Sequence, residues 1–349
     1  MKAQCIVMAA GGSGGHLLPA QALARRLSQA GYDVVFIGVG LKNNPFFQKC
    51  SMVFHDVSGA SFSSKEFWKA PFRILSGIIK SLKLLIKLRP TAVVGFGSYH
   101  SFPPQAAAWL LRVPLLLFEP NLELGKVNHL FFRYAKRCMS YFIADHQKVT
   151  RIHPMTCYQR FDPVEAKKRL EINSPLPILV VMGGSQGSMI INRCVQKIDP
   201  ALLKHFFIIH LCGTEVEREI LQKFYQEHHL PAMIQPFSHQ MELILSCADI
   251  MISRCGASAL MEAMIYCLPT LFIPYGSDQQ GHQHANARYF VEHLKGGMMI
   301  QQEEIGNKNF PDAIEELIKN RKVLHANLSA HQHTPKACVM DVIAQEIKP

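Results

Sequence analysis

The chain contains the stretch Ile6-Val7-Met8-Ala9-Ala10-Gly11-Gly12-Ser13-Gly14-Gly15-His16, in which a compact apolar run passes directly into a glycine-rich loop. A second stretch of the same kind, Ile178-Leu179-Val180-Val181-Met182-Gly183-Gly184-Ser185-Gln186-Gly187, opens the other half of the chain. Each stretch predicts a buried strand, a tight loop and a helix. Such loops bring backbone N–H groups and the positive end of a helix dipole close to an anion. The repeat therefore predicts two similar phosphate-binding α/β domains that face a shared cleft.

Length and composition are those of an ordinary globular protein. The 349 residues suffice for two cores, and the 48% of hydrophobic and 18% of charged residues argue against disorder. No segment approaches the roughly 20 uninterrupted apolar residues of a membrane-spanning helix, and the first apolar run is shorter than a signal peptide requires. The ten cysteines show no CxxC pair, which argues against a structural zinc site and a disulfide framework. We expect a reducing cytoplasm as the location.

Strand and helix signals alternate along the whole chain, which predicts a parallel sheet in each half. In the first half, we expect a helix over residues 18–30 and strands over residues 34–37, 92–95 and 115–118. In the second half, we expect strands over residues 207–211, 250–253 and 270–274. Turn-forming and charged residues between 151 and 177 predict an irregular linker. Pro335 is expected to open a final helix.

The net charge of +11 calls for an anionic partner. A predicted helix over residues 71–88 carries a basic stripe, formed by Arg73, Lys80, Lys83 and Lys87. Its other side is apolar, with Ile74, Leu75, Ile78, Ile79, Leu82, Leu85 and Ile86. This composition is typical of helices that lie on an anionic membrane surface, and the alternative is a crossover helix with a solvated charged face. No nucleic-acid-binding motif accompanies the charge, so we expect no nucleic acid as partner.

Two common phosphate ligands do not fit the sequence. The second strand ends in Gly38-Val39-Gly40-Leu41 and lacks the acid that holds the ribose in a dinucleotide site, and neither glycine loop ends like a P-loop. A nucleotide diphosphate remains. The second half offers Arg254-Cys255-Gly256-Ala257-Ser258, then Glu262, then a polar run over residues 278–286. A carboxylate can hold both ribose hydroxyls, and amide or imidazole groups can hold sugar hydroxyls.

Four motifs resemble, in order and spacing, those of glycosyltransferase family 28. They are residues 11–19, Gly95-Phe96-Gly97-Ser98-Tyr99, residues 183–187 with Asn192, and Arg254-Cys255-Gly256-Ala257 with Glu262. The resemblance implies a GT-B fold with two Rossmann-like domains, at residues 1–153 and 178–334, joined by a linker over residues 154–177. It also implies that the C-terminal helix at residues 335–349 packs back onto the first domain.

The resemblance also implies an activity and a location. Members of this family that act in peptidoglycan synthesis move N-acetylglucosamine from UDP-GlcNAc to the MurNAc 4-hydroxyl of lipid I with inversion, which forms lipid II. Such an enzyme would be peripheral, at the cytoplasmic face of the bacterial inner membrane, and this favours the membrane interpretation of the basic helix. The alternatives are another GT-B nucleotide-sugar enzyme, such as a UDP-GlcNAc 2-epimerase, and a non-catalytic basic protein that binds nucleotide sugars or nucleic acids.

The site residues that the resemblance implies fall into two groups. On the donor side, Ser185 and Gln186 would contact the phosphates, Phe237, Arg254 and Ala257 would surround the uracil, Glu262 would hold the ribose, and His282 and Gln283 would contact the sugar. On the acceptor side, Ser13, Gly14 and Gly15 would receive the lipid diphosphate, Asn121 would bind substrate, and His16 and Tyr99 would lie near the reacting centre. Arg151 and Arg160 are both candidates for an arginine that contacts the donor near the hinge.

Two residues compete for the role of the catalytic base. His16 has a suitable unperturbed pKa, about 6.5, but could instead only help to hold phosphate. Glu119 follows a buried strand and could instead fix its loop through hydrogen bonds. The helix that begins after Gly187 would stabilise the leaving diphosphate, and no acidic pair stands at a suitable loop, so we expect no metal and no cofactor. His282 and His284 are two residues apart and do not share a helix face, which argues against a metal site formed by these two histidines.

Overall fold

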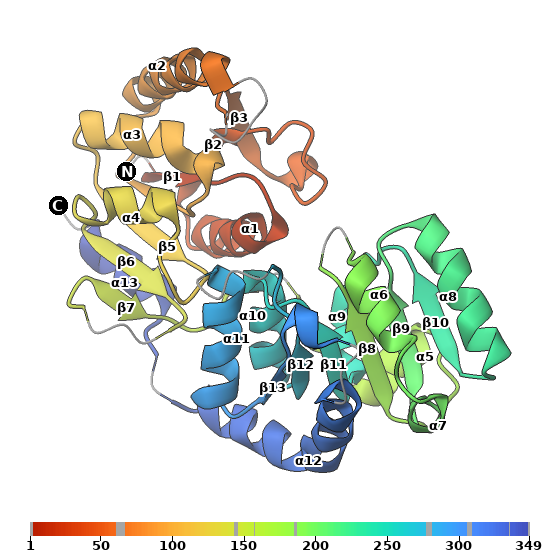
Figure 1. Ribbon diagram of the computed structural model, residues 1–349. Helices are drawn as coiled ribbons and strands as arrows, with labels where there is room; N and C mark the ends of the chain where they lie inside the picture. The colour runs from red at the N-terminus through yellow and green to blue at the C-terminus, as the bar shows by residue number, and fades with distance from the viewer. Residues whose placement is uncertain are drawn as a thin grey trace. The chain divides into compact units, whose positions relative to one another are not determined.

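The structure is a computed structural model that describes residues 3–60, 67–142, 146–156, 158–184, 187–276, 281–305, 309–334 and 336–347. The chain divides into two compact units. Unit 1 comprises Met1–Cys157 together with Pro335–Pro349, and unit 2 comprises Tyr158–Thr334. In both units, strands alternate with helices along the chain (Figure 1).

Unit 1 is built on a parallel sheet. Within the described residues it has seven strands in the order β3-β2-β1-β4-β5-β6-β7. The strands are β1 (Cys5–Ala9), β2 (Asp33–Val39), β3 (Val53–Val57), β4 (Ala92–Gly95), β5 (Leu115–Glu119), β6 (Arg137–Ser140) and β7 (Val149–Arg151). The strand order reverses between β1 and β4, and in such sheets ligands bind at the carboxyl ends of the strands beside this point. The first glycine loop follows β1 directly.

Helices cover both faces of this sheet, and apolar side chains from strands and helices form its core. The helices of unit 1 are α1 (Gly14–Gln29), α2 (Ala70–Leu88), α3 (Phe102–Leu110), α4 (Lys126–Phe132) and α13 (Val339–Glu346), with short 3-10 turns η1 (Lys49–Ser51), η2 (Phe67–Lys69) and η3 (Tyr99–Ser101). Helix α1 starts four residues before the predicted position, because Ser13 is extended and the glycines that follow it are already helical.

The C-terminal segment lies on unit 1. Its helix starts at Val339 rather than at Pro335, because Ala337 first forms a parallel bridge with Ile152 beside β7. Glu346 at the end of α13 pairs with Arg137 of β6, with 2.8 Å between oxygen and nitrogen. This ion pair and the bridge attach the last residues to the edge of the sheet.

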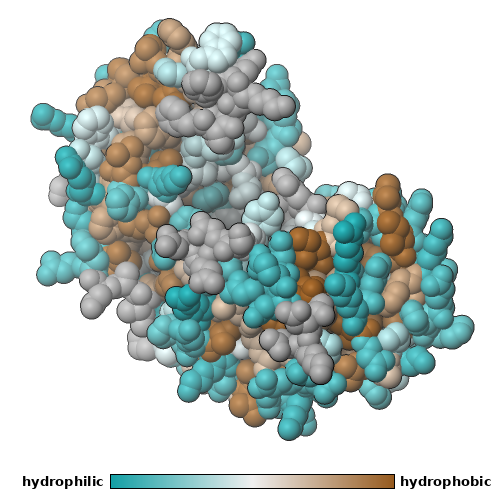
Figure 2. All heavy atoms as spheres, viewed as in Figure 1, coloured by the Kyte–Doolittle hydropathy of each residue, from teal (hydrophilic) through white to brown (hydrophobic). Residues whose placement is uncertain are grey.

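Helix α2 is amphipathic, as the sequence predicts, but part of its apolar side is exposed. Its apolar residues do not form one buried side. Ile78, Leu82 and Leu85 pack on the core, whereas Phe72, Leu75, Ile79 and Ile86 are 76%, 55%, 45% and 60% exposed. Figure 2 shows apolar side chains, in brown, over the part of unit 1 where Figure 1 draws α2 and α3. The basic stripe therefore borders an exposed apolar stripe. No helix in the described parts of the chain is both long and apolar enough to cross a bilayer.

Unit 2 repeats the plan of unit 1. Its described residues form a six-stranded parallel sheet in the order β10-β9-β8-β11-β12-β13. The strands are β8 (Ile178–Met182), β9 (Phe207–Leu211), β10 (Ala232–Gln235), β11 (Ile250–Ser253), β12 (Thr270–Phe272) and β13 (Gly297–Met299). The order reverses between β8 and β11, and the second glycine loop follows β8. Each glycine loop thus lies beside the reversal point of its own sheet.

The helices of unit 2 are α5 (Pro163–Arg169), α6 (Met189–Val195), α7 (Pro200–Leu203), α8 (Glu215–Glu227), α9 (Met241–Cys247), α10 (Ala257–Tyr266), α11 (His282–Glu292) and α12 (Asn309–Gln332), with the 3-10 turn η4 (Gln302–Glu304). Helix α5 lies in the stretch predicted to be irregular, and that prediction is wrong for these residues. The Asp162 side chain accepts the N–H groups of Val164 and Glu165, and Pro163 occupies the first turn. Both features are helix-start signals.

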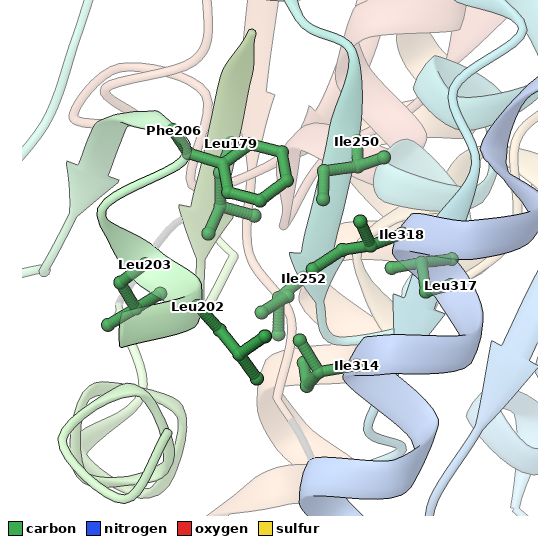
Figure 3. A pocket seen from close by; sticks show the side chains of 9 residues that line it. All are labelled: Leu179, Leu202, Leu203, Phe206, Ile250, Ile252, Ile314, Leu317 and Ile318. Carbon is green, nitrogen blue, oxygen red and sulfur yellow. The ribbon is translucent and has the colours of Figure 1, made fainter. Parts of the chain in front are cut away.

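A small cavity of about 10 Å³ lies in the described core of unit 2 and is shown in Figure 3. Its lining is entirely apolar and comes from β8, β11, α7, the turn after α7, and α12, through Leu179, Leu202, Leu203, Phe206, Ile250, Ile252, Ile314, Leu317 and Ile318. A cavity holds water only where polar groups can bind it. This cavity is therefore a dry packing defect, and no ligand site.

Candidate functional site

The first glycine loop joins β1 to α1 and leaves the start of the helix uncapped. Gly12 has φ +86°, a conformation that favours glycine, and its carbonyl oxygen accepts a hydrogen bond from Asn44 Nδ2 at 2.7 Å. Ser13 occupies the N-cap position, but its side chain makes no capping hydrogen bond. The first-turn N–H groups of a helix have no acceptor within the helix. The N–H groups around Gly14 and Gly15 are therefore placed to bind an anion.

His16 lies in the first turn of α1 and is fixed by the neighbouring segment. Its Nδ1 atom lies 2.6 Å from the carbonyl oxygen of Phe96, just after β4. A carbonyl can only accept, so Nδ1 carries the hydrogen and the lone pair of the neutral ring is on Nε2. That tautomer is the one a general base at Nε2 needs. Tyr99, in the same segment as Phe96, has a side chain that is 42% exposed.

His100 belongs to this group, although it stands outside the four sequence motifs. Its ring lies against Gly11 and Gly12: a Cβ atom at either position would come within 2.6 Å of His100. The ring centroid lies 3.8 Å from that of Tyr99. Burial, and secondarily the charge of His16, lowers the pKa of His100 to about 4. The only sequence signal was its place directly after the Gly95–Tyr99 motif.

Glu119 ends β5 and has all of its acceptor positions used. It is 2% exposed. One carboxylate oxygen accepts the backbone and side-chain N–H groups of Asn121, at 3.1 and 3.0 Å. The other accepts Gly125 N and Asn128 Nδ2, each at 2.9 Å. The carboxylate is thus the centre of the loop that connects β5 to α4, and Asn121 is one of the residues it holds. Asn128 was not singled out from the sequence.

The second glycine loop is described only in part, because Ser185 and Gln186 lie outside the described residues. Gly187 has φ +72°, and a Cβ atom there would meet Gly213 Cα at 2.6 Å. Asn192 of α6 holds the segment that Gly187 contacts, since its Nδ2 donates to the carbonyl oxygen of Cys212, next to Gly213, at 3.0 Å. The buried His210 lies 3.0 Å from Asn192 Oδ1, and burial lowers its pKa to about 3. A buried polar network therefore fixes the loop.

Arg254, which follows β11, connects several segments of unit 2. It is 6% exposed, and its Nη1 donates to the carbonyl oxygens of Ile273 and Pro274 at 3.0 and 2.8 Å. Its Nη2 donates to Ser188 Oγ and Gln302 Oε1 at 3.1 and 2.9 Å. These four bonds occupy both terminal nitrogens. The geometry favours a bracing role for Arg254 over direct contact with a uracil ring.

Glu262 lies in the second turn of α10, which starts at Ala257, and it is nearly buried. In the described residues its carboxylate makes no hydrogen bond and no ion pair. Burial raises its pKa to about 8. A buried carboxylate is stable only when donors satisfy it or when it holds a proton. The carboxylate of Glu262 can therefore accept hydrogen bonds from a ligand, and a pair of ribose hydroxyls can donate them.

Three further predicted donor-side residues lie on the surface of unit 2. Phe237 follows β10, is 48% exposed, and stands edge-on to His239. His282 and Gln283 open α11, and the side-chain Oε1 of Gln283 accepts Tyr275 N at 3.0 Å. Residues 278–280, the start of the polar run predicted to hold sugar hydroxyls, lie outside the described residues. No three histidine, cysteine, aspartate or glutamate residues of the described chain come together as metal ligands.

The predicted residues therefore gather at the carboxyl end of each sheet. In unit 1, residues after β1, β4 and β5 bring His16, Tyr99 and Glu119 to that edge. In unit 2, residues after β8, β11 and β12 do the same for the second loop, Arg254 and α11. The candidate hinge residue Arg151 ends β7 in unit 1, whereas Arg160 belongs to unit 2.

Comparison with known proteins agrees with this architecture. Residues 6–140 match the model of the glycosyltransferase family 28 N-terminal domain, and residues 178–343 match that of the glycosyltransferase family 28 C-terminal domain. A relative from Protochlamydia amoebophila (strain UWE25) is 34% identical over 340 residues, which is 92% of this chain and 90% of the relative. One from Chlamydia pneumoniae is 34% identical over 320 residues, 88% of this chain and 87% of the relative.

Both relatives are named UDP-N-acetylglucosamine–N-acetylmuramyl-(pentapeptide) pyrophosphoryl-undecaprenol N-acetylglucosamine transferase. Among solved structures, Acinetobacter baumannii MurG is similar with a TM-score of 0.73 and 24% identity, and the match covers 98% of each chain. This likeness confirms the predicted GT-B fold. With both domain models and the relatives in agreement, the chain belongs to glycosyltransferase family 28.

Proposed function

We propose that this protein transfers N-acetylglucosamine from UDP-GlcNAc to lipid I and so forms lipid II. The family membership and the names of the relatives support this substrate pair. The single observation that carries the proposal is Glu262. It is a nearly buried carboxylate with no partner in the described residues, at the carboxyl end of the unit 2 sheet, where a nucleotide ribose would supply two donors.

The donor binds to unit 2 in this proposal. Glu262 accepts the ribose hydroxyls, and the exposed ring of Phe237 offers a surface for the uracil. Ser185, Gln186, Ala257, His282 and Gln283 are the remaining proposed contacts to the phosphates, the base and the sugar. Arg254 acts on the donor indirectly, because its guanidinium holds Ser188 beside the second glycine loop.

The acceptor binds to unit 1. N–H groups around Ser13, Gly14 and Gly15 receive the lipid diphosphate, and Asn121 and Tyr99 contact the acceptor nearby. Nε2 of His16 takes the proton from the MurNAc 4-hydroxyl as its oxygen forms the bond to C1 of the sugar. The bond from C1 to the β-phosphate breaks, and UDP leaves with the electron pair. Glu119 positions the loop after β5, since its carboxylate already accepts four N–H groups.

The acceptor is a lipid, so the enzyme must reach a membrane, and α2 offers the surface. Phe72, Leu75, Ile79 and Ile86 follow one another at helical spacing and are exposed. Lys83 and Lys87 stand exposed beside them, and Lys80 also donates to the carbonyl oxygen of Asp56. We name these seven residues the α2 surface. Its apolar stripe with a basic border fits an anionic bilayer, which would make the protein peripheral at the inner face of the bacterial membrane.

The central experiment is a transfer assay with the purified protein. UDP-GlcNAc and a short-chain lipid I analogue are incubated with the enzyme, and UDP release and the disaccharide product are followed with and without EDTA. We expect UDP release only when the acceptor is present. Release without acceptor, or formation of UDP-ManNAc, would instead indicate hydrolysis or 2-epimerisation and would overturn the proposal. Loss of activity in EDTA would overturn only the expectation that no metal takes part.

A further inference from the structure

Ser98 holds an unusual backbone conformation beside the first glycine loop. Its φ is 62° and its ψ is 162°, a region that favours glycine and strains a residue with a side chain. The Ser98 hydroxyl accepts His100 N at 3.3 Å and lies 3.2 Å from His100 Nδ1. It also reaches the carbonyl oxygen of Gly11 at 3.5 Å. A glycine here would avoid the strain but would lose every one of these contacts.

His100 transmits the position of Ser98 to the loop. A Cβ atom on Gly11 would lie 2.6 Å from His100 Cβ, and one on Gly12 would lie 2.6 Å from His100 Nδ1. The Tyr99 ring stacks on the same imidazole, and Asn44 Nδ2 holds the Gly12 carbonyl at 2.7 Å. The loop is therefore in close contact with the imidazole, and a shift of His100 must move Gly11 and Gly12.

The imidazole of His100 is uncharged in this setting. Burial is the main reason that the pKa of His100 falls to about 4, and the neighbouring charge of His16 adds to it. The single hydrogen of the Ser98 hydroxyl has two acceptors in reach, and Nδ1 of the neutral ring, at 3.2 Å, is nearer than the Gly11 carbonyl, at 3.5 Å. With Nδ1 as the acceptor, the ring hydrogen lies on Nε2. His100 thus supports the loop without placing a positive charge beside His16.

The same segment also fixes His16 directly. Phe96, two residues before Ser98, accepts His16 Nδ1, and His16 follows Gly12 by four residues. We propose that Ser98 and His100 form a positioning pair that holds the Gly11–Gly12 loop, and with it His16, in the place where the acceptor reacts. This inference rests on the proposed function, and it assigns to the pair a role on the acceptor side only.

Steady-state kinetics of four variants test the pair. Ser98→Gly and His100→Val each remove the contact, His100→Asn keeps an acceptor at the Nδ1 position, and the double variant Ser98→Gly/His100→Val removes both partners. The exposed His205→Val is the matched control. A small misplacement of reacting groups is costly, so we expect kcat/KM for the lipid I analogue to fall about tenfold or more in both single variants. The Kd for UDP should stay unchanged.

The pattern among the variants separates positioning from a general loss of stability. We expect His100→Asn to recover most of the activity, and the double variant to be no worse than the worse single variant, because both changes break one contact. Ser98→Gly should unfold no more easily than the wild type, since it relieves strain. Equal losses in UDP and acceptor binding, additive losses, or wild-type kinetics in His100→Val would overturn the inference.

A second readout does not depend on transfer. In protein labelled with ¹⁵N-histidine, the imidazole shifts at pH 7 report the tautomer of each ring. We expect His100 to carry its hydrogen on Nε2, and both Ser98→Gly and His100→Val to shift the His16 signals. An unchanged His16 in both variants would overturn the inference. Failure of the wild type to transfer sugar would overturn the proposed function, while this measurement would still decide whether the pair positions His16.

Discussion

Nδ1 of His16 lies 2.6 Å from the carbonyl oxygen of Phe96, so the first turn of α1 and the segment after β4 are joined at one point. Because that carbonyl fixes which ring nitrogen carries the hydrogen, it presents the lone pair of the neutral ring on Nε2. The contact thus selects the tautomer that a base requires and the ring orientation that goes with it.

Replacement of His16 tests its role as the base. We expect His16→Ala to lower kcat by a factor of about 10² to 10⁴, the usual contribution of a general base. UDP should bind to the variant with unchanged affinity, as measured by calorimetry, because unit 2 holds the donor in our proposal. The exposed His129→Ala is the control in the same unit. A His16→Ala enzyme with normal kcat and a raised acceptor KM would show that His16 only holds phosphate.

Glu119 is expected to matter for folding more than for proton transfer. In Glu119→Gln, an amide NH₂ would face two N–H groups that now donate to a carboxylate oxygen. The lost charge-assisted bonds should lower the free energy of unfolding by about 2–4 kcal/mol. The two tryptophans of the chain, Trp68 and Trp109, both lie in unit 1, so tryptophan fluorescence during urea unfolding reports this unit.

The control for this measurement is Glu123→Gln, which changes an exposed carboxylate in the same loop. It should leave the unfolding transition in place. If Glu119→Gln kept wild-type stability and lost its turnover, Glu119 would be the base after all, and its four hydrogen bonds would be incidental.

Short apolar runs made much of the fold predictable. Residues 92–95, 178–182, 207–211 and 250–253 are strands with the predicted bounds, because each is a continuous buried run in a parallel sheet. Strands at or next to a sheet edge were missed. β6, which lies next to the edge strand β7, and β10, which is an edge strand, carry polar residues and are stabilised by pairing with neighbouring strands, a long-range contact that has no local signal.

For the candidate site, local motifs likewise indicated several residues, and their long-range partners were missed. His16 and Glu262 stand in local motifs, and both lie at the carboxyl end of a sheet. The partners of these residues come from elsewhere in the chain. His100 reaches Gly11 and Gly12 across 88 residues or more, and Asn128 reaches Glu119 from the next helix. The sequence left two interpretations of α2 open, because periodicity shows that a helix is amphipathic but not how much of its apolar side the domain covers.

The α2 surface is expected to control membrane binding. Each basic residue near an anionic bilayer contributes about 1 kcal/mol, so Lys83→Gln/Lys87→Gln should weaken binding to vesicles with 30% phosphatidylglycerol by a factor of about 10 to 30. Phe72→Ser/Ile79→Ser should weaken it at every salt concentration, since the apolar contribution is not screened. Sedimentation with vesicles measures both effects.

Lys168→Gln/Lys223→Gln is the matched control, because it removes the same charge from exposed positions of unit 2. It should bind vesicles like the wild type. Equal weakening by this control and by the α2 variant would show that net charge alone drives binding, and would refute a docking role for α2.

The cavity in unit 2 leads to a stability prediction. Ile314 lies in α12, is 2% exposed, and lines the cavity (Figure 3). Ile314→Ala should lower the free energy of unfolding by about 2–5 kcal/mol, because it enlarges a void that the neighbours already fail to fill. The exposed Val323→Ala in the same helix should change it little. An unfolding transition that is seen by circular dichroism but not by tryptophan fluorescence reports unit 2. Equal losses of unfolding free energy in Ile314→Ala and Val323→Ala would contradict the packing of Ile314 around the cavity.

The raised pKa of Glu262 makes the stability of unit 2 depend on pH. Burial raises this pKa from 4.5 to about 8, so between these values the folded protein keeps a proton that the unfolded chain has lost. Its contribution is therefore fully present below pH 4.5 and is lost as the pH rises to 8. Glu262→Gln cannot ionise and should raise Tm by several degrees at pH 8.5 but not at pH 4.5, whereas the exposed Glu219→Gln should do neither.

The carboxyl group of Glu262 should also make UDP binding depend on pH. The affinity for UDP should rise with pH, whereas the stability of unit 2 falls. Ribose hydroxyls bind the ionised carboxylate, so binding lowers the pKa of Glu262 and releases a proton, and the affinity for UDP should rise between pH 7 and 8.5. Glu262→Gln should bind UDP about 10- to 100-fold more weakly, with the pH dependence removed. The analogue 2′,3′-dideoxy-UDP should show the same flat profile with the wild type, because it lacks the donors. A wild-type affinity for UDP that fell over this range would mean that the protonated carboxyl binds the ribose, and the stability gain in Glu262→Gln would then come without a loss of donor affinity.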